Sequence, residues 1–208
     1  MALTESEFKD RWSKLHGGAD VEGVVGGWLS FSYQAARVCT ALRITPNLLT
    51  LLGLLTAIAM ALSTYAAIAL LLLVVSLFFD GIDGSVAIFQ HRESKFGATL
   101  DSVVDRISEA LWFYALYAIG VPAWIPITLW SVAAFQEYAR AKLVSLGVSD
   151  IGVVTPAERP VRASFLFIVL ILNQLDMPGA TELSVAFLLL QIYSFVSVVR
   201  FSRSRLLQ

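Results

Sequence analysis

The chain has 208 residues, of which 57% are hydrophobic, and its formal net charge is −1. Ordinary soluble domains are about 45–50% apolar, so this composition excludes a typical soluble protein and predicts one that crosses a membrane several times. The only cysteine, Cys39, excludes an intramolecular disulfide, and we expect its side chain to be a small buried hydrophobic group.

Residues 1–44 predict a segment at the membrane surface. Thr4 followed by Glu7 fits a capping box, in which each side chain accepts a free N–H at the start of a helix. Phe8, Trp12 and Leu15 recur at i, i+4 and i+7 on one helical face opposite charged side chains, which predicts a short amphipathic helix. The aromatic-rich stretch that follows favours a second helix in the interface plane, with packing against the bundle as the alternative.

Six apolar stretches follow within residues 45–200, and most approach the length of about 20 residues that a bilayer core requires. We expect them to form an all-α integral-membrane domain of six transmembrane helices. The predicted spans are Pro46–Tyr65, Ala67–Ala87, Gly97–Ile119, Pro122–Arg140, Val161–Leu175 and Leu183–Val199.

The basic residues predict the orientation of these spans. All 15 Lys and Arg lie in the N-terminal segment, in the loops after the second and fourth spans, in the halves of the spans that adjoin these segments, or in the tail 201–208. If six helices alternate in direction, these segments share one face. The positive-inside rule makes that face cytoplasmic, with both termini inside. We therefore expect a multi-pass protein of the cell (inner) membrane.

Four aspartates gather where the second span ends and the third begins. Asp80 and Asp83 are three residues apart and Asp101 and Asp105 four apart, so each pair shares one helix face. Acids left unpaired at membrane depth cost roughly 2.5–3.5 kcal/mol each, so a shared cation is expected. Oxygen ligands favour Mg²⁺, Mn²⁺ or Ca²⁺. A divalent-cation transporter or channel is one alternative, although both spans are otherwise almost entirely apolar except for Glu109.

The motif around these acids resembles the signature of the CDP-alcohol phosphotransferase (CDP-alcohol phosphatidyltransferase) family: Asp80-x2-Asp83-Gly84-x2-Ala87-x9-Gly97-x3-Asp101-x3-Asp105. The similarity begins at Thr45 and covers most of the chain. The family pattern has Arg after the Ala, where this chain has Ile88. Arg92 or Lys95 is then the expected source of a charge contact to the donor's diphosphate, and a catalytically inactive family member is a further alternative.

The resemblance implies a phospholipid-synthesis transferase that moves a phosphatidyl group from a CDP-linked lipid, such as CDP-diacylglycerol, to a polar alcohol and releases CMP. It implies that Asp80, Asp83, Asp101 and Asp105 hold two metal ions, Mg²⁺ or alternatively Mn²⁺, and that Asp105 is also the catalytic base. Such paired ions would align an in-line attack on the β-phosphorus from the cytoplasmic side. Similar enzymes are homodimers among membrane lipids, so we expect a homodimer, and nothing indicates nucleic-acid binding.

The same resemblance marks a binding site for the CDP-linked lipid. Three small residues of the motif would let a nucleotide lie against helix backbone, with tight helix packing as the alternative. The expected donor-binding residues are Gly84, Ala87, Gly97, Thr45, Pro46, Asn47, Leu48 and Ser94.

Basic residues at the ends of the last three spans predict the acceptor site. Glu158-Arg159-Pro160-Val161-Arg162 resembles the acceptor-phosphate site of actinobacterial phosphatidylinositol-phosphate synthases. Guanidinium groups bind phosphate bidentately, so the predicted acceptor is a phosphorylated polyol such as inositol phosphate or glycerol 3-phosphate. Positive-inside anchoring is the alternative explanation of these charges, and Glu137 is expected to pair with Arg140. The expected acceptor-binding residues are Arg140, Lys142, Arg159, Arg162 and Arg200.

Overall fold

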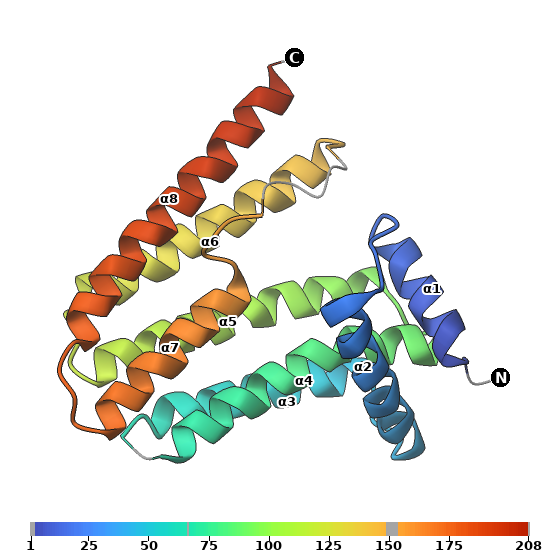
Figure 1. Ribbon diagram of the computed structural model, residues 1–208, viewed down its shortest axis with the longest axis horizontal. Coiled ribbons are helices and arrows are strands. Elements are labelled where there is room, and N and C mark those ends of the chain that lie inside the picture. Colours follow the sequence, from blue (N-terminus) through green and yellow to red (C-terminus); the bar gives the residue numbers. More distant parts are fainter. Residues whose placement is uncertain (1–2, 66, 149–153, 208) are drawn as a thin grey trace. The chain divides into compact units, whose positions relative to one another are not determined.

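The structure is a computed structural model that describes residues 3–65, 67–148 and 154–207. The regular structure of this part of the chain consists of eight helices, as the all-α prediction requires (Figure 1). The predicted N-terminal segment and C-terminal tail also include residues 1–2 and 208, which lie outside this description. The helices are α1 Glu5–Leu15, α2 Gly23–Ala41, α3 Pro46–Leu62, α4 Ile68–Gln90, α5 Lys95–Ala118, α6 Trp124–Ser145, α7 Arg159–Gln174 and α8 Ala180–Leu206.

Helices α3 to α8 coincide with the six predicted spans. Most of their ends agree within three residues, whereas α6 continues to Ser145 and α8 to Leu206. Within the described residues, α4 and α8 are each long and apolar enough to cross a membrane, and α2 with α3 qualifies only as a pair bent by 104°. Helices α3 and α7 are short, with 17 and 16 residues, while α5 and α6 carry several charged side chains. Six crossings and their orientation stay predictions.

The chain divides into two compact units. The first contains residues 1–56 and 74–107, and the second contains residues 57–73 and 108–208. Helices α3, α4 and α5 therefore each contribute one part to each unit. All four motif aspartates belong to the first unit, and all the expected acceptor-binding residues belong to the second.

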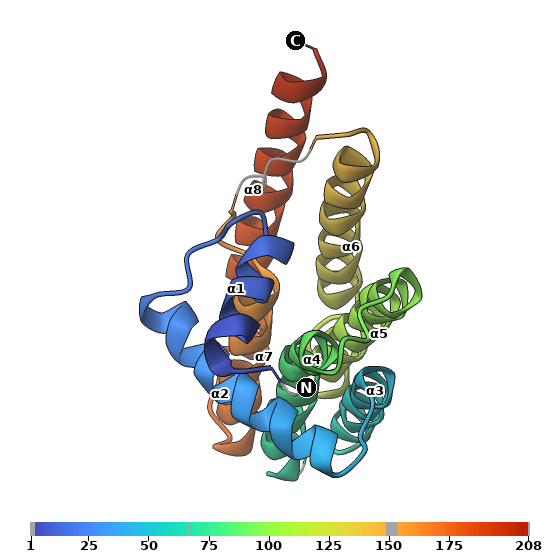
Figure 2. The ribbon, with the colours of Figure 1, turned by 90° about the vertical axis from the view of Figure 1, so that its right-hand side faces the viewer.

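In the first unit, α1 packs against α2 (Figure 2). The predicted capping box is confirmed, because the Glu7 N–H donates to Thr4 Oγ1 at 3.3 Å and the Thr4 N–H donates to Glu7 Oε2 at 2.8 Å. Phe8 is fully buried, and its ring centroid lies 5.7 Å from that of Tyr33 on α2. Leu15 is 56% exposed, so the buried face of α1 is shorter than the sequence pattern suggests.

Helix α2 is buried along part of its apolar surface and exposed along the rest. Leu29, Ala36 and Cys39 are buried in one core with residues of α1, α3 and α4, which confirms that Cys39 is a small buried side chain. Trp28 and Phe31 are 43% and 50% exposed, although their rings also contact α4. Helix α2 therefore packs against the bundle, while its exposed apolar side chains suit the predicted place of this helix at a membrane interface.

In the second unit, α8 packs along α6 and also against α7 (Figures 1 and 2). The Phe165 and Phe187 rings stack at a centroid distance of 4.2 Å between α7 and α8. The turn joining these two helices has positive φ angles at Asp176 and Gly179, of 51° and 114°. Glycine adopts a positive φ without steric cost, so Gly179 can end the turn and α8 can begin at Ala180.

Candidate active site

The aspartate pairs are positioned by the turn between α4 and α5. Helix α4 ends at Gln90, and His91 follows in the left-handed region with φ 53°. Ser94 then starts α5, because its Oγ accepts the Gly97 N–H at 2.9 Å. Two helices joined by so short a loop keep their adjoining ends together.

Three of the four motif aspartates form a cluster. Asp80, Asp101 and Asp105 each offer a carboxylate oxygen, and these oxygens all lie within 4.8 Å of one another. The three side chains are half-buried, and Arg106 Nη2 lies 3.6 Å from Asp105 Oδ2. Three converging carboxylates are a hard, oxygen-only donor set, which suits Mg²⁺ or Mn²⁺ and disfavours zinc. The side chains present therefore fit a divalent ion.

Asp83 has a different environment from the other three acids. It is 6% exposed, and its Oδ2 accepts a hydrogen bond from Thr50 Oγ1 at 2.5 Å. Thr50 lies on α3, so this bond ties α3 to α4 beside the cluster. Asp83 is not among the three clustered ligands, and its role as a fourth metal ligand stays a prediction.

A cavity of about 210 Å³ lies beside these acids. Six of the eight expected donor-binding residues line it, whereas Thr45 and Leu48 do not. The hydroxyl of Thr45 accepts the Leu48 N–H at 3.4 Å near the start of α3, and Leu48 is 44% exposed. The residues lining the cavity are Pro46, Asn47, Thr50, Asp83, Gly84, Ala87, Arg92, Glu93, Ser94, Gly97, Ala98 and Asp101.

The two motif glycines differ in the space around them. A Cβ added at Gly84 would meet no atom within 4 Å. Gly84 therefore borders open space and is not in tight contact with a neighbouring helix. At Gly97, an added Cβ would lie 3.0 Å from Ser94 Oγ and 3.4 Å from Asn47 Oδ1. Of the two interpretations of Gly84, this geometry favours close approach of a ligand to the helix backbone.

Ile88 stands where the family pattern has arginine, and its side chain is buried in the core. It is 4% exposed and belongs to the cluster that contains Phe8 and Leu29. It is absent from the lining of the donor cavity, whereas Arg92 lines it. Of the two basic residues considered for a charge contact to the donor, Arg92 is therefore placed for it and Lys95 is not among the lining residues.

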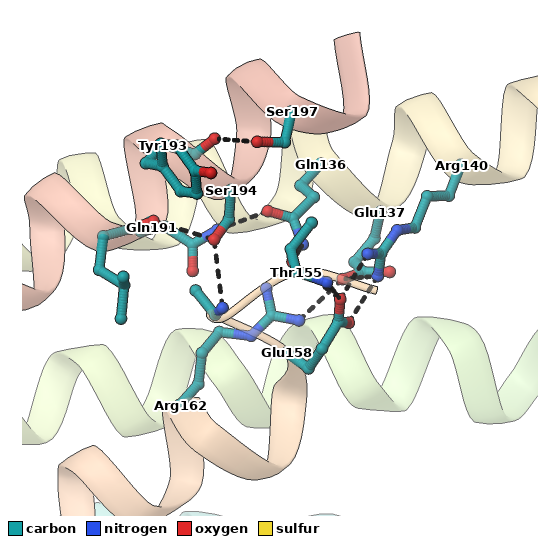
Figure 3. A network of polar contacts seen from close by, with 12 residues as sticks. Gln136, Glu137, Arg140, Thr155, Glu158, Arg162, Gln191, Tyr193, Ser194 and Ser197 are labelled. Carbon is teal, nitrogen blue, oxygen red and sulfur yellow. Dashed lines mark hydrogen bonds and ion pairs between the residues drawn. The ribbon is translucent and has the colours of Figure 1, made fainter. Parts of the chain in front are cut away.

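The second unit contains an ion-pair network around the start of α7 (Figure 3). Arg140 Nη1 and Nη2 donate to the two carboxylate oxygens of Glu158 at 2.7 and 2.6 Å. Glu158 also accepts the N–H and the hydroxyl of Thr155, at 2.7 and 2.8 Å. Glu158 lies before α7, outside the predicted spans. Burial alone would raise the pKa of Glu158, but the hydrogen bonds from Arg140 and Thr155 outweigh it and lower the pKa to about 2.

Arg162 is buried in the same network. Its side chain is fully buried, and it lies 2.9 Å from Glu109 (Nε to Oε1) and 2.7 Å from Glu137 (Nη2 to Oε1). Glu137 Oε1 also lies 3.5 Å from Arg140 Nη1, which confirms the predicted pairing of these two residues on α6. Arg140 and Arg162 are therefore already neutralised by three glutamates, which the sequence motif alone did not indicate.

Buried amide side chains extend this network to α8 (Figure 3). Gln191 Nε2 donates to Gln136 Oε1 at 2.9 Å, and Gln136 Nε2 lies 3.4 Å from Thr155 Oγ1. Ser194 Oγ accepts the Ala157 N–H at 3.1 Å. Gln136, Gln191 and Ser194 are fully buried, so they fix the segment before α7 against α6 and α8.

The remaining expected acceptor-binding residues have other surroundings. Lys142 and Arg200 are exposed. The Arg159 guanidinium carbon lies 5.2 Å from the centre of the Trp112 ring, a cation–π contact. Whether these five basic residues bind an acceptor stays a prediction.

The fold and the carboxylate cluster together define a helical protein whose clustered acids fit a divalent ion and lie next to a cavity. The sequence model of CDP-alcohol phosphatidyltransferases matches residues 43–199. This match covers more than half of the chain, so the protein belongs to the CDP-alcohol phosphatidyltransferase family.

Named relatives agree with this assignment. The phosphatidylinositol phosphate synthase of Corynebacterium glutamicum is 33% identical over 162 residues, which are 72% of this chain and 73% of that protein. The archaetidylinositol phosphate synthase of Pyrococcus horikoshii is 31% identical over 146 residues, 67% of this chain and 76% of that protein. The archaetidylinositol phosphate synthase of Aeropyrum pernix is 39% identical over 107 residues, which are 50% of this chain and 55% of that enzyme.

Solved structures share the fold. The crystal structure of Mycobacterium tuberculosis phosphatidylinositol phosphate synthase with CDP-DAG bound is 24% identical and superposes with a TM-score of 0.64, covering 82% of this chain and 92% of that one. A second structure of that enzyme, in complex with manganese and citrate, has the same TM-score and covers 86% of its chain.

Proposed function

We propose that this protein transfers a phosphatidyl group from a CDP-diacylglycerol-type lipid to a polar alcohol and releases CMP. The observation that carries the proposal is the carboxylate cluster of Asp80, Asp101 and Asp105, because Asp101 also lines the neighbouring cavity. Such a juxtaposition suits a ligand that carries a diphosphate, since a metal-bound diphosphate needs acids on one side and room for a nucleotide on the other.

Asp80, Asp101 and Asp105 would hold Mg²⁺, with Mn²⁺ as the alternative and Asp83 as a further carboxylate for a second ion. Bound divalent ions would neutralise charge on the diphosphate and on the departing CMP. The oxygen-only donor set supports this choice of metal.

The residues of the chain would then position and deprotonate the reactants. Asp105 accepts the proton of the acceptor hydroxyl, whose oxygen forms a bond to the β-phosphorus of the donor. The bond from that phosphorus to CMP breaks, and CMP leaves with the electron pair. Gly84 and Ala87 let the nucleotide approach the α4 backbone, and Arg92 contacts the diphosphate.

The proposed acceptor is inositol phosphate, with glycerol 3-phosphate as the second choice. The names of the relatives support inositol phosphate, since their products carry it. In this proposal Lys142, Arg159 and Arg200 supply charge to the phosphate. An acceptor phosphate would compete with Glu137 for Arg140 and Arg162.

We further propose that the protein is a homodimer of the cell (inner) membrane and that its active site opens to the cytoplasm. The distribution of all 15 basic residues over segments that would share one face supports the orientation. Family membership favours the transferase over a divalent-cation transporter.

The test is an acceptor screen with purified, full-length protein in detergent, CDP-diacylglycerol and Mg²⁺, in which CMP release is measured. Inositol phosphate is compared with glycerol 3-phosphate and with unphosphorylated inositol and glycerol. We expect the fastest CMP release with inositol phosphate and little with inositol. No CMP with any acceptor, from protein that still binds Mn²⁺, would contradict the transferase and support an inactive family member.

A further inference from the structure

A second polar cavity lies in the first unit, and none of the clustered aspartates lines it. It has a volume of about 350 Å³ and is lined by Thr40, Arg43, Gln90 and Arg92. Thr40 and Arg43 come from the end of α2 and the turn into α3, whereas Gln90 and Arg92 come from the end of α4 and the loop after it. Two arginines distant in sequence thus line one space.

Hydrogen bonds fix the two segments that form this cavity. Gln90 Nε2 donates to the Ile44 carbonyl at 2.8 Å and to Thr40 Oγ1 at 3.1 Å. The backbone of Arg43 is left-handed, with φ 59°, and that of His91 beside Arg92 is left-handed too, with φ 53°. Non-glycine residues seldom adopt this conformation, and where they do the surrounding structure holds them in it.

Within the part of the chain that the structure describes, no carboxylate lies within ion-pair distance of Arg43 or Arg92. Glu93 is adjacent to Arg92, but it pairs with Arg11 of α1 at 2.7 Å (Nε to Oε1). Arg11 Nη1 also lies 2.6 Å from His91 Nδ1. Helix α1 thus neutralises the acid that would otherwise be available to Arg92.

The surroundings of the cavity suit a membrane surface. It lies where α2 bends by 104° into α3, a candidate for a broken span. Val38 and Leu42, beside Thr40 and Arg43, are 58% and 66% exposed. Exposed apolar side chains flanking arginine are the pattern of a segment at the depth of lipid headgroups.

We propose that Arg43 and Arg92, with the Thr40 hydroxyl as a further donor, form a binding site for a phosphate group that is separate from the metal cluster, and that the Gln90 amide holds the two segments together. Two guanidinium groups supply paired donors and the charge that a phosphate requires. The phosphate is carried by an anionic phospholipid headgroup or is a free phosphate ion. Because Arg92 also lines the donor cavity, a bound phosphate would fix the position of this side chain next to the donor.

The test measures binding without turnover, so its result does not depend on the proposed transferase activity. Full-length protein in neutral detergent is titrated with dioleoyl phosphatidylglycerol, dioleoyl phosphatidylcholine or inorganic phosphate. Lipid binding is read by native mass spectrometry and phosphate binding by calorimetry. The variants are Arg43→Asn, because asparagine tolerates the left-handed backbone, and Arg43→Lys, which keeps the charge. Arg37→Gln is the matched control, since Arg37 lies exposed on α2 and donates to Gln34.

If the ligand is a lipid headgroup, phosphatidylglycerol binds about 30-fold more tightly than phosphatidylcholine, as expected for two arginines acting on an anionic lipid. Arg43→Asn lowers this preference to about fivefold, Arg43→Lys keeps most of it, and Arg37→Gln leaves it unchanged. If the ligand is free phosphate, inorganic phosphate binds in an Arg43-dependent way and the two lipids bind equally. The proposal is overturned if Arg43→Asn changes none of these affinities, or if Arg37→Gln lowers them as much.

Discussion

Asp105 combines two roles at the scale of a single residue, as a member of the carboxylate cluster and as the proposed base. The Asp105→Asn substitution keeps the size of the side chain but removes its charge and its ability to accept the proton. We expect CMP release to fall by at least about 100-fold, in the range that general bases contribute.

The matched control for this substitution is Asp176→Asn. Asp176 is exposed in the turn before α8 and has a left-handed backbone, which asparagine also accepts. CMP release should be unchanged in this control. Near-normal CMP release by Asp105→Asn would show that another group takes the proton.

Thr50 is the residue that sequence reasoning missed at the site. Its hydroxyl donates to the buried Asp83 carboxylate, so Thr50→Val removes that donor at almost constant volume. Loss of a group that orients a metal ligand typically costs about 10–100-fold in metal affinity or activity. We expect the Mg²⁺ concentration for half-maximal activity to rise by about tenfold or more.

Thr56→Val is the control on the same helix, because Thr56 Oγ1 donates only to the Leu52 and Gly53 carbonyls of its own helix. It should leave the Mg²⁺ dependence unchanged. An unaltered Mg²⁺ dependence in Thr50→Val would mean that Asp83 does not depend on this hydrogen bond.

The sequence indicated the aspartates but not the partner of Asp83, for a physical reason. Spacing along one helix predicts which side chains share a face, as for Asp101 and Asp105. The Thr50–Asp83 contact joins residues 33 positions apart, and it exists only because α3 lies against α4. One signal was available, since Thr50 follows Pro46 by four residues and so shares its helical face.

At the scale of the element, Ile88 shows why this position of α4 is apolar here. It packs in the core shared with α1 and α2 and is 4% exposed. Ile88→Arg, which would restore the family residue, buries an unpaired charge in this core. We expect a loss of roughly 3–5 kcal/mol in the free energy of unfolding, measured by denaturant unfolding in detergent.

Leu15→Arg controls for a new arginine in the same unit. Leu15 is 56% exposed at the last turn of α1, where a cation is favourable. Its stability should stay near that of the unaltered protein. An Ile88→Arg variant that is equally stable would show that α1 and α2 can move to let the guanidinium reach the donor cavity.

The start of α7 depends on the ionised form of Glu158. The pKa of Glu158 in the fold, about 2, is below its ordinary value of 4.5. The Arg140–Glu158 contact therefore contributes stability that is complete above about pH 4.5 and is lost as the pH falls toward 2. At pH 7, Glu158→Gln should lower the unfolding temperature by about 3 °C or more.

The check is a comparison of both proteins by thermal unfolding between pH 8 and pH 3. The difference between them should be constant down to about pH 4.5 and shrink below it. A difference that grows on acidification would show that the sign of the Glu158 effect is wrong.

The helices themselves were largely predictable from the sequence. The lengths of the apolar stretches predicted the positions of α3 to α8, and the capping box at Thr4 predicted the start of α1. The end of α8 was not predicted, because the apolar pattern stops near Val199 while the helix runs to Leu206. Arginine is a good helix former, so a change to charged residues ends a predicted span without ending a helix.

At the scale of the whole molecule, each unit has its own polar centre. The first contains the aspartates and the donor cavity, and the second contains the network of Arg140, Arg162 and their glutamates. The local pairing of Glu137 with Arg140 could be predicted from the sequence, because they are three residues apart on one helix, but the pairs between distant residues could not. Arg162 meets Glu137 and Glu109, which lie 25 and 53 positions earlier in the chain, and only the packing of the helices in the second unit brings them together.

The most direct measurement is CMP release from CDP-diacylglycerol by metal-stripped protein as Mg²⁺ is added back, with and without inositol phosphate. If Asp80, Asp101 and Asp105 hold the ion that the reaction needs, CMP appears only when Mg²⁺ and the acceptor are both present. Asp101→Asn should then shift the Mg²⁺ dependence to about tenfold higher concentration or more. Equal CMP release in the presence of EDTA, or an Asp101→Asn variant with an unaltered Mg²⁺ dependence, would contradict a metal-dependent transferase built on this cluster.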